Sequence, residues 1–118
     1  MAKGSFRIEL NMVDRVMEMQ IGGTFTAEDY ARFIAEYEKK TASLDGPSYT
    51  LRVDCKAMDL LSAQEVESLK GSFEKYKQTG FREVVFIITE AQLFMKMQLK
   101  RVARSAGLDN VEVVTEGA

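Results

Sequence analysis

The residue types that most often carry catalysis are scarce in this chain of 118 residues, which contains no histidine and one cysteine. The absence of histidine excludes Ser–His and Cys–His nucleophile pairs, imidazole general bases and the commonest zinc and haem ligands. A single cysteine cannot hold an iron–sulfur cluster or a thiolate zinc site. Carboxylate, lysine, tyrosine and hydroxyl chemistry remains. We predict that the protein is not an enzyme and that it binds no cofactor.

Three acidic residues, Asp54, Asp59 and Glu65, gather around one predicted loop. Carboxylate oxygens are the ligands that a hard cation prefers. The spacing matches no ordered metal-binding loop, such as a calcium loop with its central glycine. We therefore interpret the three residues as solvated charges and predict no metal site.

Ser62 and Glu65 form the pattern Ser-x-x-Glu directly before apolar residues at helical spacing. This is the capping box that begins many helices, in which the serine hydroxyl accepts a hydrogen bond from the backbone N–H three residues later. We interpret Ser62 as a helix N-cap. The alternative interpretation is a phosphorylation site, because a helix N-terminus favours added negative charge.

Cys55 carries the one thiol of the chain. It alternates with Leu51 and Val53, so the three side chains share one side of a predicted strand. A reactive thiol needs neighbouring cations that lower its pKa, and Lys56 is a single cation. The sequence therefore predicts a buried, inert thiol.

Length and composition indicate a single domain, residues 1–118. Basic and acidic residues number 16 and 18, and a net charge of −2 argues against a nucleic-acid partner. No apolar run approaches the ~20 residues of a membrane-spanning helix, and the first residues lack the apolar core of a signal peptide. We expect a cytoplasmic protein.

Hydrophobic periodicity divides the chain into strands and helices. The predicted strands are residues 5–10, 15–21, 49–55, 84–88 and 111–114, and the predicted helices begin after residues 26, 62 and 89. Residues 5–21 form an antiparallel hairpin that ends at Gly22-Gly23, and a loop at residues 56–61 precedes the second helix. Gly80 follows the second helix as a left-handed C-cap, and Gly107 ends the third helix. Residues 115–118 are expected to be a disordered tail.

The element order is β-β-α-β-α-β-α-β, which predicts an α/β fold with an N-terminal antiparallel hairpin and parallel strands in one mixed sheet. Residues 84–88 are continuously apolar and rich in β-branched side chains. Such a strand is buried on both faces and lies inside a sheet. Three helices at strand crossovers would then cover that sheet.

This element order, together with the stretch GGTFTAEDY at residues 22–30, resembles the STAS family of anti-sigma-factor-antagonist-like domains and their broader SpoIIAA-like relatives. The resemblance covers nearly the whole chain. It implies the STAS/SpoIIAA-like fold and a regulatory domain that binds another protein.

The regulatory members of this family carry a phosphorylatable serine within an Asp-Ser-Ser-Gly-like motif at a helix start. The matching positions are Asp54 at the strand end and residues 62–65, Ser-Ala-Gln-Glu. Ser62 then matches the aspartate of the motif, Gln64 the phosphoserine and Glu65 the glycine. The resemblance therefore implies that the family's phosphoserine site has been lost here.

The third predicted helix carries more large apolar residues than one sheet-facing stripe needs. Its sheet-facing set is Gln92, Met95, Leu99, Val102, Ala103 and Ala106. Left over are Leu93, Phe94 and Met97, beside Lys96, Lys100, Arg101 and Arg104. One interpretation is that a broad sheet absorbs the extra residues as core. The other is a contact surface for a protein partner or a second copy, or less favourably for an anionic membrane.

Our favoured hypothesis is a non-catalytic regulatory protein-interaction module. The predicted partner-binding residues are Asp59, Ser62, Gln64, Glu65, Phe94 and Met97. The alternative is a domain that binds a small apolar ligand or lipid in a cavity beneath Tyr30 and Phe73, since some SpoIIAA-like relatives resemble lipid-binding domains in fold. A third hypothesis is an enzyme that uses carboxylates and tyrosine. It is retained only because these residues can still carry out catalysis in a chain without histidine.

Overall fold

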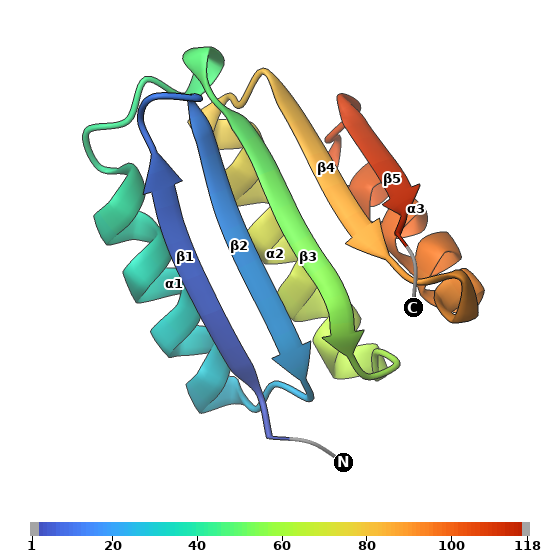
Figure 1. The fold of residues 1–118 in the computed structure, drawn as a ribbon. Coiled ribbons are helices and arrows are strands. Elements are labelled where there is room, and N and C mark those ends of the chain that lie inside the picture. The colour runs from blue at the N-terminus through green and yellow to red at the C-terminus, as the bar shows by residue number, and fades with distance from the viewer. Residues whose placement is uncertain (1–2, 117–118) are drawn as a thin grey trace.

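The computed structural model describes residues 3–116, which form one five-stranded sheet and three α-helices (Figure 1). The strands are β1 (Ser5–Asn11), β2 (Val16–Gly23), β3 (Thr50–Met58), β4 (Glu83–Ile88) and β5 (Val111–Thr115). The helices are α1 (Ala27–Thr41), α2 (Ala63–Thr79) and α3 (Leu93–Ala106), with 3-10 turns at Gly46–Ser48 and Glu90–Gln92.

The strands lie in the sheet in the order of the chain, β1-β2-β3-β4-β5. β1 pairs antiparallel with β2, and β2 to β5 are parallel. Because strand crossovers are right-handed and the order never reverses, all three helices lie on one face of the sheet, as Figure 1 shows. The parallel strands that precede the helices therefore end, and the helices begin, at the same edge.

The hairpin extends further than the sequence predicts. Asn11 Oδ1 accepts hydrogen bonds from the backbone N–H groups of Val13 and Asp14 and forms the turn. Gly22-Gly23 does not end β2, since Gly22 pairs with Ser5 on one side and Ala57 on the other. A Cβ at Gly22 would lie 3.1 Å from Ser5 Oγ and 3.2 Å from Ala57 Cβ. The glycine therefore lets three strands approach closely.

The predicted capping box of Ser62 and Glu65 is present at the start of α2. Thr26 with Asp29 forms a second box at the start of α1, and Thr89 with Gln92 forms a third at the 3-10 turn before α3. Gly80 and Gly107 end α2 and α3 with φ angles of 78° and 75°. These helix boundaries are set by local chemistry, which is why the sequence predicts them well.

The core lies between the sheet and the helices. β4 is buried on both faces as predicted: Phe86 faces the helices, and Val85 and Ile87, on the opposite face, are only 7% and 5% exposed. Elsewhere that opposite face is charged. Arg52 on β3, for example, lies 3.8 Å from Glu18 and 3.7 Å from Glu116.

Two strand ends differ from the prediction. β3 continues through Ala57 and Met58, because Gly22 and Gly23 of β2 remain close enough to pair with them. At the C-terminus, Thr115 pairs with Ile88, and the Glu116 N–H donates to the Ile88 carbonyl at 2.8 Å. The expected disordered tail therefore does not begin at residue 115, and residues 117 and 118 lie outside the described residues. Within residues 3–116, no helix is both long enough and apolar enough to cross a membrane.

Candidate functional site: a cavity between α1 and α2

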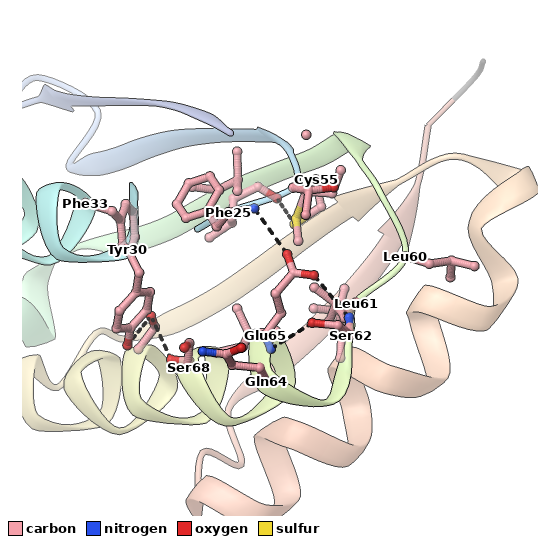
Figure 2. Close-up of a pocket in the computed structure, with 18 of the residues that line it drawn as sticks. Phe25, Tyr30, Phe33, Cys55, Leu60, Leu61, Ser62, Gln64, Glu65 and Ser68 are labelled. Atoms are coloured by element: carbon pink, nitrogen blue, oxygen red, sulfur yellow. Dashed lines mark hydrogen bonds between the residues drawn. The ribbon is translucent and has the colours of Figure 1, made fainter. Parts of the chain in front are cut away.

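A cavity of about 460 Å³ lies between the N-terminal halves of α1 and α2, above the C-terminal ends of β2 and β3 (Figure 2). Ligand pockets are typically ~300–1,000 Å³ in volume. The walls are mainly aliphatic and aromatic: Ile21, Phe25, Phe33, Val53, Met58, Leu60, Leu61, Leu69, Tyr76, Phe86 and Leu99. Its polar lining comes from Thr24, Thr26, Tyr30, Ser62, Gln64, Glu65, Ser68 and Ser72.

The first wall is the N-terminal half of α1. The capping box of Thr26 and Asp29 fixes the start of this helix after β2. Tyr30 and Phe33 then follow at helical spacing and line the cavity. Phe33 also packs edge-to-face on Phe25, with ring centroids 6.2 Å apart. The helix is thereby held against the sheet at its core side while Tyr30 reaches towards α2.

The second wall is one face of α2, formed by residues at spacings of three and four: Glu65, Ser68, Leu69, Ser72 and Tyr76. Two of the five are serines, which are too small to fill the space between the helices. The Ser72 hydroxyl donates to the Tyr30 hydroxyl at 3.0 Å and forms the polar contact across the gap. The cavity exists because the side chains on this face of α2 are small where the helix packs against α1.

Glu65 joins the two helix starts at the mouth of the cavity. Its carboxylate accepts hydrogen bonds from the Ser62 N–H at 3.1 Å and from the Phe25 N–H at 3.2 Å, and Figure 2 shows the side chain between them. Nearby, the Thr24 hydroxyl donates to Asp59 at 2.6 Å. Asp59, in the loop before α2, and Glu65, in the first turn of α2, therefore hold the connection between β2 and α1 in place by hydrogen bonds.

Burial raises the pKa values of two side chains in the cavity wall, Tyr76 and Cys55. Burial raises the pKa of the Tyr76 hydroxyl. Burial, with a smaller contribution from Asp54, raises the pKa of the Cys55 thiol. The prediction of a buried thiol is confirmed, because Cys55 is fully enclosed. A thiol in this environment is a poor nucleophile.

Comparison with known proteins places the fold. The sequence matches no family model and no curated protein. A similar solved structure is an uncharacterized protein of the DUF3478 family from Shewanella loihica PV-4, described as having a SpoIIAA-like fold. It aligns with a TM-score of 0.69 at 21% identity, over 97% of this chain and 87% of that one. This chain has the SpoIIAA-like fold. The predicted fold is therefore confirmed, and the likeness is one of fold.

In this SpoIIAA-like fold, four of the predicted partner-binding residues lie together. Ser62, Gln64 and Glu65 line the cavity at the start of α2, and Asp59 adjoins it through Thr24. The Ser62 hydroxyl accepts from the Glu65 N–H at 3.2 Å, as an N-cap does. Phosphorylation of this exposed serine stays a prediction.

The other two predicted residues lie on α3, away from the cavity lining. Leu93, Phe94 and Met97 are 65%, 64% and 62% exposed, and we call these three residues the α3 face. The interpretation that a broad sheet absorbs them as core is therefore wrong. The sheet-facing set is confirmed for the five residues Met95, Leu99, Val102, Ala103 and Ala106, which are buried. Gln92 is half-buried and donates to the Cys55 carbonyl at 3.0 Å.

The structure does not bring the three acidic residues together. Asp54 lies on the open face of the sheet beside Lys56, at 3.8 Å, whereas Asp59 and Glu65 lie on the helix side. Among residues 3–116, no group of three or more histidine, cysteine, aspartate or glutamate residues is placed to hold a metal ion.

The cavity lies beside the position that the sequence predicts. Tyr30 lines it, but Phe73 does not: its ring stacks on Phe86 with centroids 4.9 Å apart and is fully buried. Sequence analysis missed Ser68 and Ser72. Their i, i+4 spacing on the helix was the available signal, because small residues on an inward face leave space.

Proposed function

We propose that this domain is a non-catalytic binding protein whose ligand is a small apolar molecule held between α1 and α2. The observation that carries the proposal is the largely apolar cavity of about 460 Å³. It lies at the C-terminal ends of β2 and β3, the edge of the sheet where the loops of α/β proteins most often carry binding residues. The proposal corresponds to the ligand-binding alternative predicted from the sequence.

The size of the cavity suits a molecule larger than a single ring. An apolar cavity of roughly 150 Å³ stays dry and accepts benzene. The cavity here is about 460 Å³, which leaves room for a chain or fused ring system. An empty apolar cavity also lowers stability because its walls lose contacts. A ligand that fills it should therefore stabilise the folded state.

The chemistry of the walls supports binding without turnover. The cavity offers the Tyr76 hydroxyl, whose pKa burial raises, a buried thiol and one carboxylate that already accepts hydrogen bonds from two backbone N–H groups. General acid–base catalysis usually relies on histidine, lysine or a pair of carboxylates. The described cavity residues include no histidine or lysine and no second carboxylate beside Glu65.

The test is binding of 1-dodecanol and of sodium dodecanoate, measured by calorimetry and by the shift in thermal midpoint. We expect the wild-type protein to bind at least one of the two. Ser68→Phe fills the cavity and should weaken that binding at least tenfold. Ser105→Phe, at an exposed position of α3, is the matched control and should bind as the wild type does. Equal binding by both variants, or no binding by the wild type, would refute the proposal.

A second candidate function is protein binding through the α3 face, the favoured hypothesis from the sequence. Three large apolar side chains more than 60% exposed on one helix are a specific reason to retain it. Cations surround them at Lys96, Lys100, Arg101 and Arg104. A partner for this surface would combine an apolar patch with acidic residues.

The double variant Phe94→Ser/Met97→Ser tests this candidate. We expect the wild-type protein to capture a partner from its own cell and the double variant to lose it. Met12→Ser is the matched control, because Met12 is a methionine at the tip of the β1–β2 hairpin that is more exposed than Met97. Loss of capture in the control, or retention in the double variant, would count against the α3 face.

A further inference from the structure

We infer that the ligand is an uncharged amphiphile, with a hydroxyl or carbonyl head group, and that the cavity rejects carboxylates such as free fatty acids. The inference rests on the proposed function and adds the chemical class of the ligand. It follows from which charges the described cavity residues carry and from how those charges are already paired.

Among the described residues that line the cavity, Glu65 is the single carboxylate and none is a lysine or arginine. The one charged side chain of this described lining is therefore negative. Proteins that hold a carboxylate in an apolar site usually supply a cation or several N–H donors to it. A ligand carboxylate near Glu65 would find repulsion in place of a partner.

The N-termini of α1 and α2, which border the cavity, do not make it a site for a ligand carboxylate. A helix start favours anions because its first N–H groups are unpaired and its dipole is positive there. Here both starts already hold carboxylates of the protein. Asp29 accepts from the Thr26 N–H at 3.0 Å, and Glu65 accepts from the Ser62 and Phe25 N–H groups. The hydrogen bond from the Thr26 backbone lowers the pKa of Asp29, so this carboxylate stays ionised.

The interior offers hydrogen bonds of the kind that an alcohol or ester uses. Tyr30 and Ser72 pair across the gap at 3.0 Å, and Ser68 lies one turn before Ser72 on the same wall. When the Ser72 hydroxyl donates to the Tyr30 oxygen, the Tyr30 hydroxyl still has its own proton to donate. A neutral ligand oxygen can accept that proton without leaving a buried charge.

The experiment compares 1-dodecanol with sodium dodecanoate at pH 8, where chain length is constant and only the head group changes. We expect the alcohol to bind at least about tenfold more tightly, because a like charge near Glu65 and the loss of hydration both oppose the carboxylate. Glu65→Gln should narrow the difference in affinity, since glutamine removes the charge and keeps one oxygen for the Ser62 N–H of the capping box, with loss of the hydrogen bond from the Phe25 N–H. Glu67→Gln, at an exposed position on the same helix, is the control and should leave the difference unchanged.

The outcomes separate this inference from the function on which it rests. Dodecanoate binding as tightly as dodecanol, in a manner that Ser68→Phe abolishes, would leave the binding function standing and overturn the ligand class. A difference that Glu65→Gln leaves intact would overturn the role of Glu65 in selection. Failure of both compounds to bind the wild-type protein would remove the function and the inference together.

Discussion

The two ends of the α1–α2 pair are built differently. In the C-terminal halves, Tyr37 and Tyr76 pack with ring centroids 5.5 Å apart, and the Tyr37 hydroxyl lies 2.5 Å from Thr79 Oγ1. Towards the N-terminal ends of the two helices, Ser72, at the middle of α2 and one turn before Tyr76, meets Tyr30 through a single hydroxyl contact. We call these the closed end and the open end.

The difference shows that one pair of packed helices can provide stability at one end and a binding cavity at the other. Tyr37 and Tyr76 bury large rings, and burial of apolar area is the main source of folding free energy. At the open end, the small residues Ser68 and Ser72 occupy the face of α2 that points towards α1, so less apolar area is buried there and the unfilled space forms the cavity. If this division is correct, substitutions at the closed end should change stability and those at the open end should mainly change binding.

The largest expected effect is at the closed end, where Tyr37→Ala should lower the free energy of unfolding by about 3–5 kcal/mol. Tyr37 does not line the cavity and is buried against Phe33 and Tyr76, so truncation leaves an unfilled space. Tyr30→Ala, at the half-buried open end, should cost less than half as much. Urea unfolding of both variants measures the difference. Similar losses at the two positions would show that the ends do not differ in packing.

Gly46→Ala should be the next largest effect. A Cβ at Gly46 would lie 1.8 Å from the backbone oxygen of Thr79, at the end of α2. Neither backbone segment can give way easily, so we expect a loss of about 3 kcal/mol, at the upper end of typical overpacking costs. Urea unfolding again measures it, with Ser48→Ala in the same 3-10 turn as the control. A loss under about 1 kcal/mol would show that this corner is looser than the structure indicates.

The contrast between the two ends also explains what the sequence could and could not predict. Capping boxes such as Ser62 with Glu65, and the alternation along each strand, are local patterns that need no knowledge of the partner element. The cavity depends on Tyr30 meeting Ser72 across 42 residues of chain, which no local pattern encodes. The exposure of Phe94 likewise depends on how much of α3 the sheet covers.

A smaller effect, visible mainly in alkali, is expected for Tyr37→Phe. Burial raises the pKa of Tyr37 to about 12, despite the opposing hydrogen bond with Thr79, whereas an unfolded tyrosine titrates near 10. A raised folded-state pKa means that stability is fully present below pH ~10 and is lost as the pH rises towards ~12. Near neutral pH the variant should lose about 1 kcal/mol with its hydrogen bond.

Between pH ~10 and ~12, the variant should lose stability less steeply than the wild type, because phenylalanine has no proton to release. Unfolding free energies measured at pH 7, 9, 10 and 11 give the two slopes. Tyr49→Phe, at a half-buried tyrosine before β3, serves as the control. Parallel slopes for Tyr37→Phe and the wild type would mean that Tyr37 ionises as easily in the folded protein as in the unfolded chain.

The smallest effect should have the opposite sign and occur at the open end. Gly71 lies inside α2, and a Cβ there would lie 3.0 Å from the Tyr30 hydroxyl oxygen and near no other heavy atom. Alanine favours a helix interior over glycine by up to about 1 kcal/mol. The Tyr30 side chain borders the cavity and has room to shift by a few tenths of an ångström. We therefore expect Gly71→Ala to stabilise the protein by about 0.5 kcal/mol.

Gly80→Ala is the matched comparison for Gly71→Ala, since it is the same substitution at the C-cap of the same helix. Gly80 has a φ of 78°, and the nearest atom to an added Cβ is 3.8 Å away, so only backbone strain opposes alanine there. We expect a loss of about 1 kcal/mol at Gly80 beside the gain at Gly71, with both measured by urea unfolding. If Gly71→Ala destabilises as much as Gly80→Ala, Tyr30 is held rigidly. The open end would then be as firmly packed as the closed end, and a ligand would have to displace Tyr30 to enter.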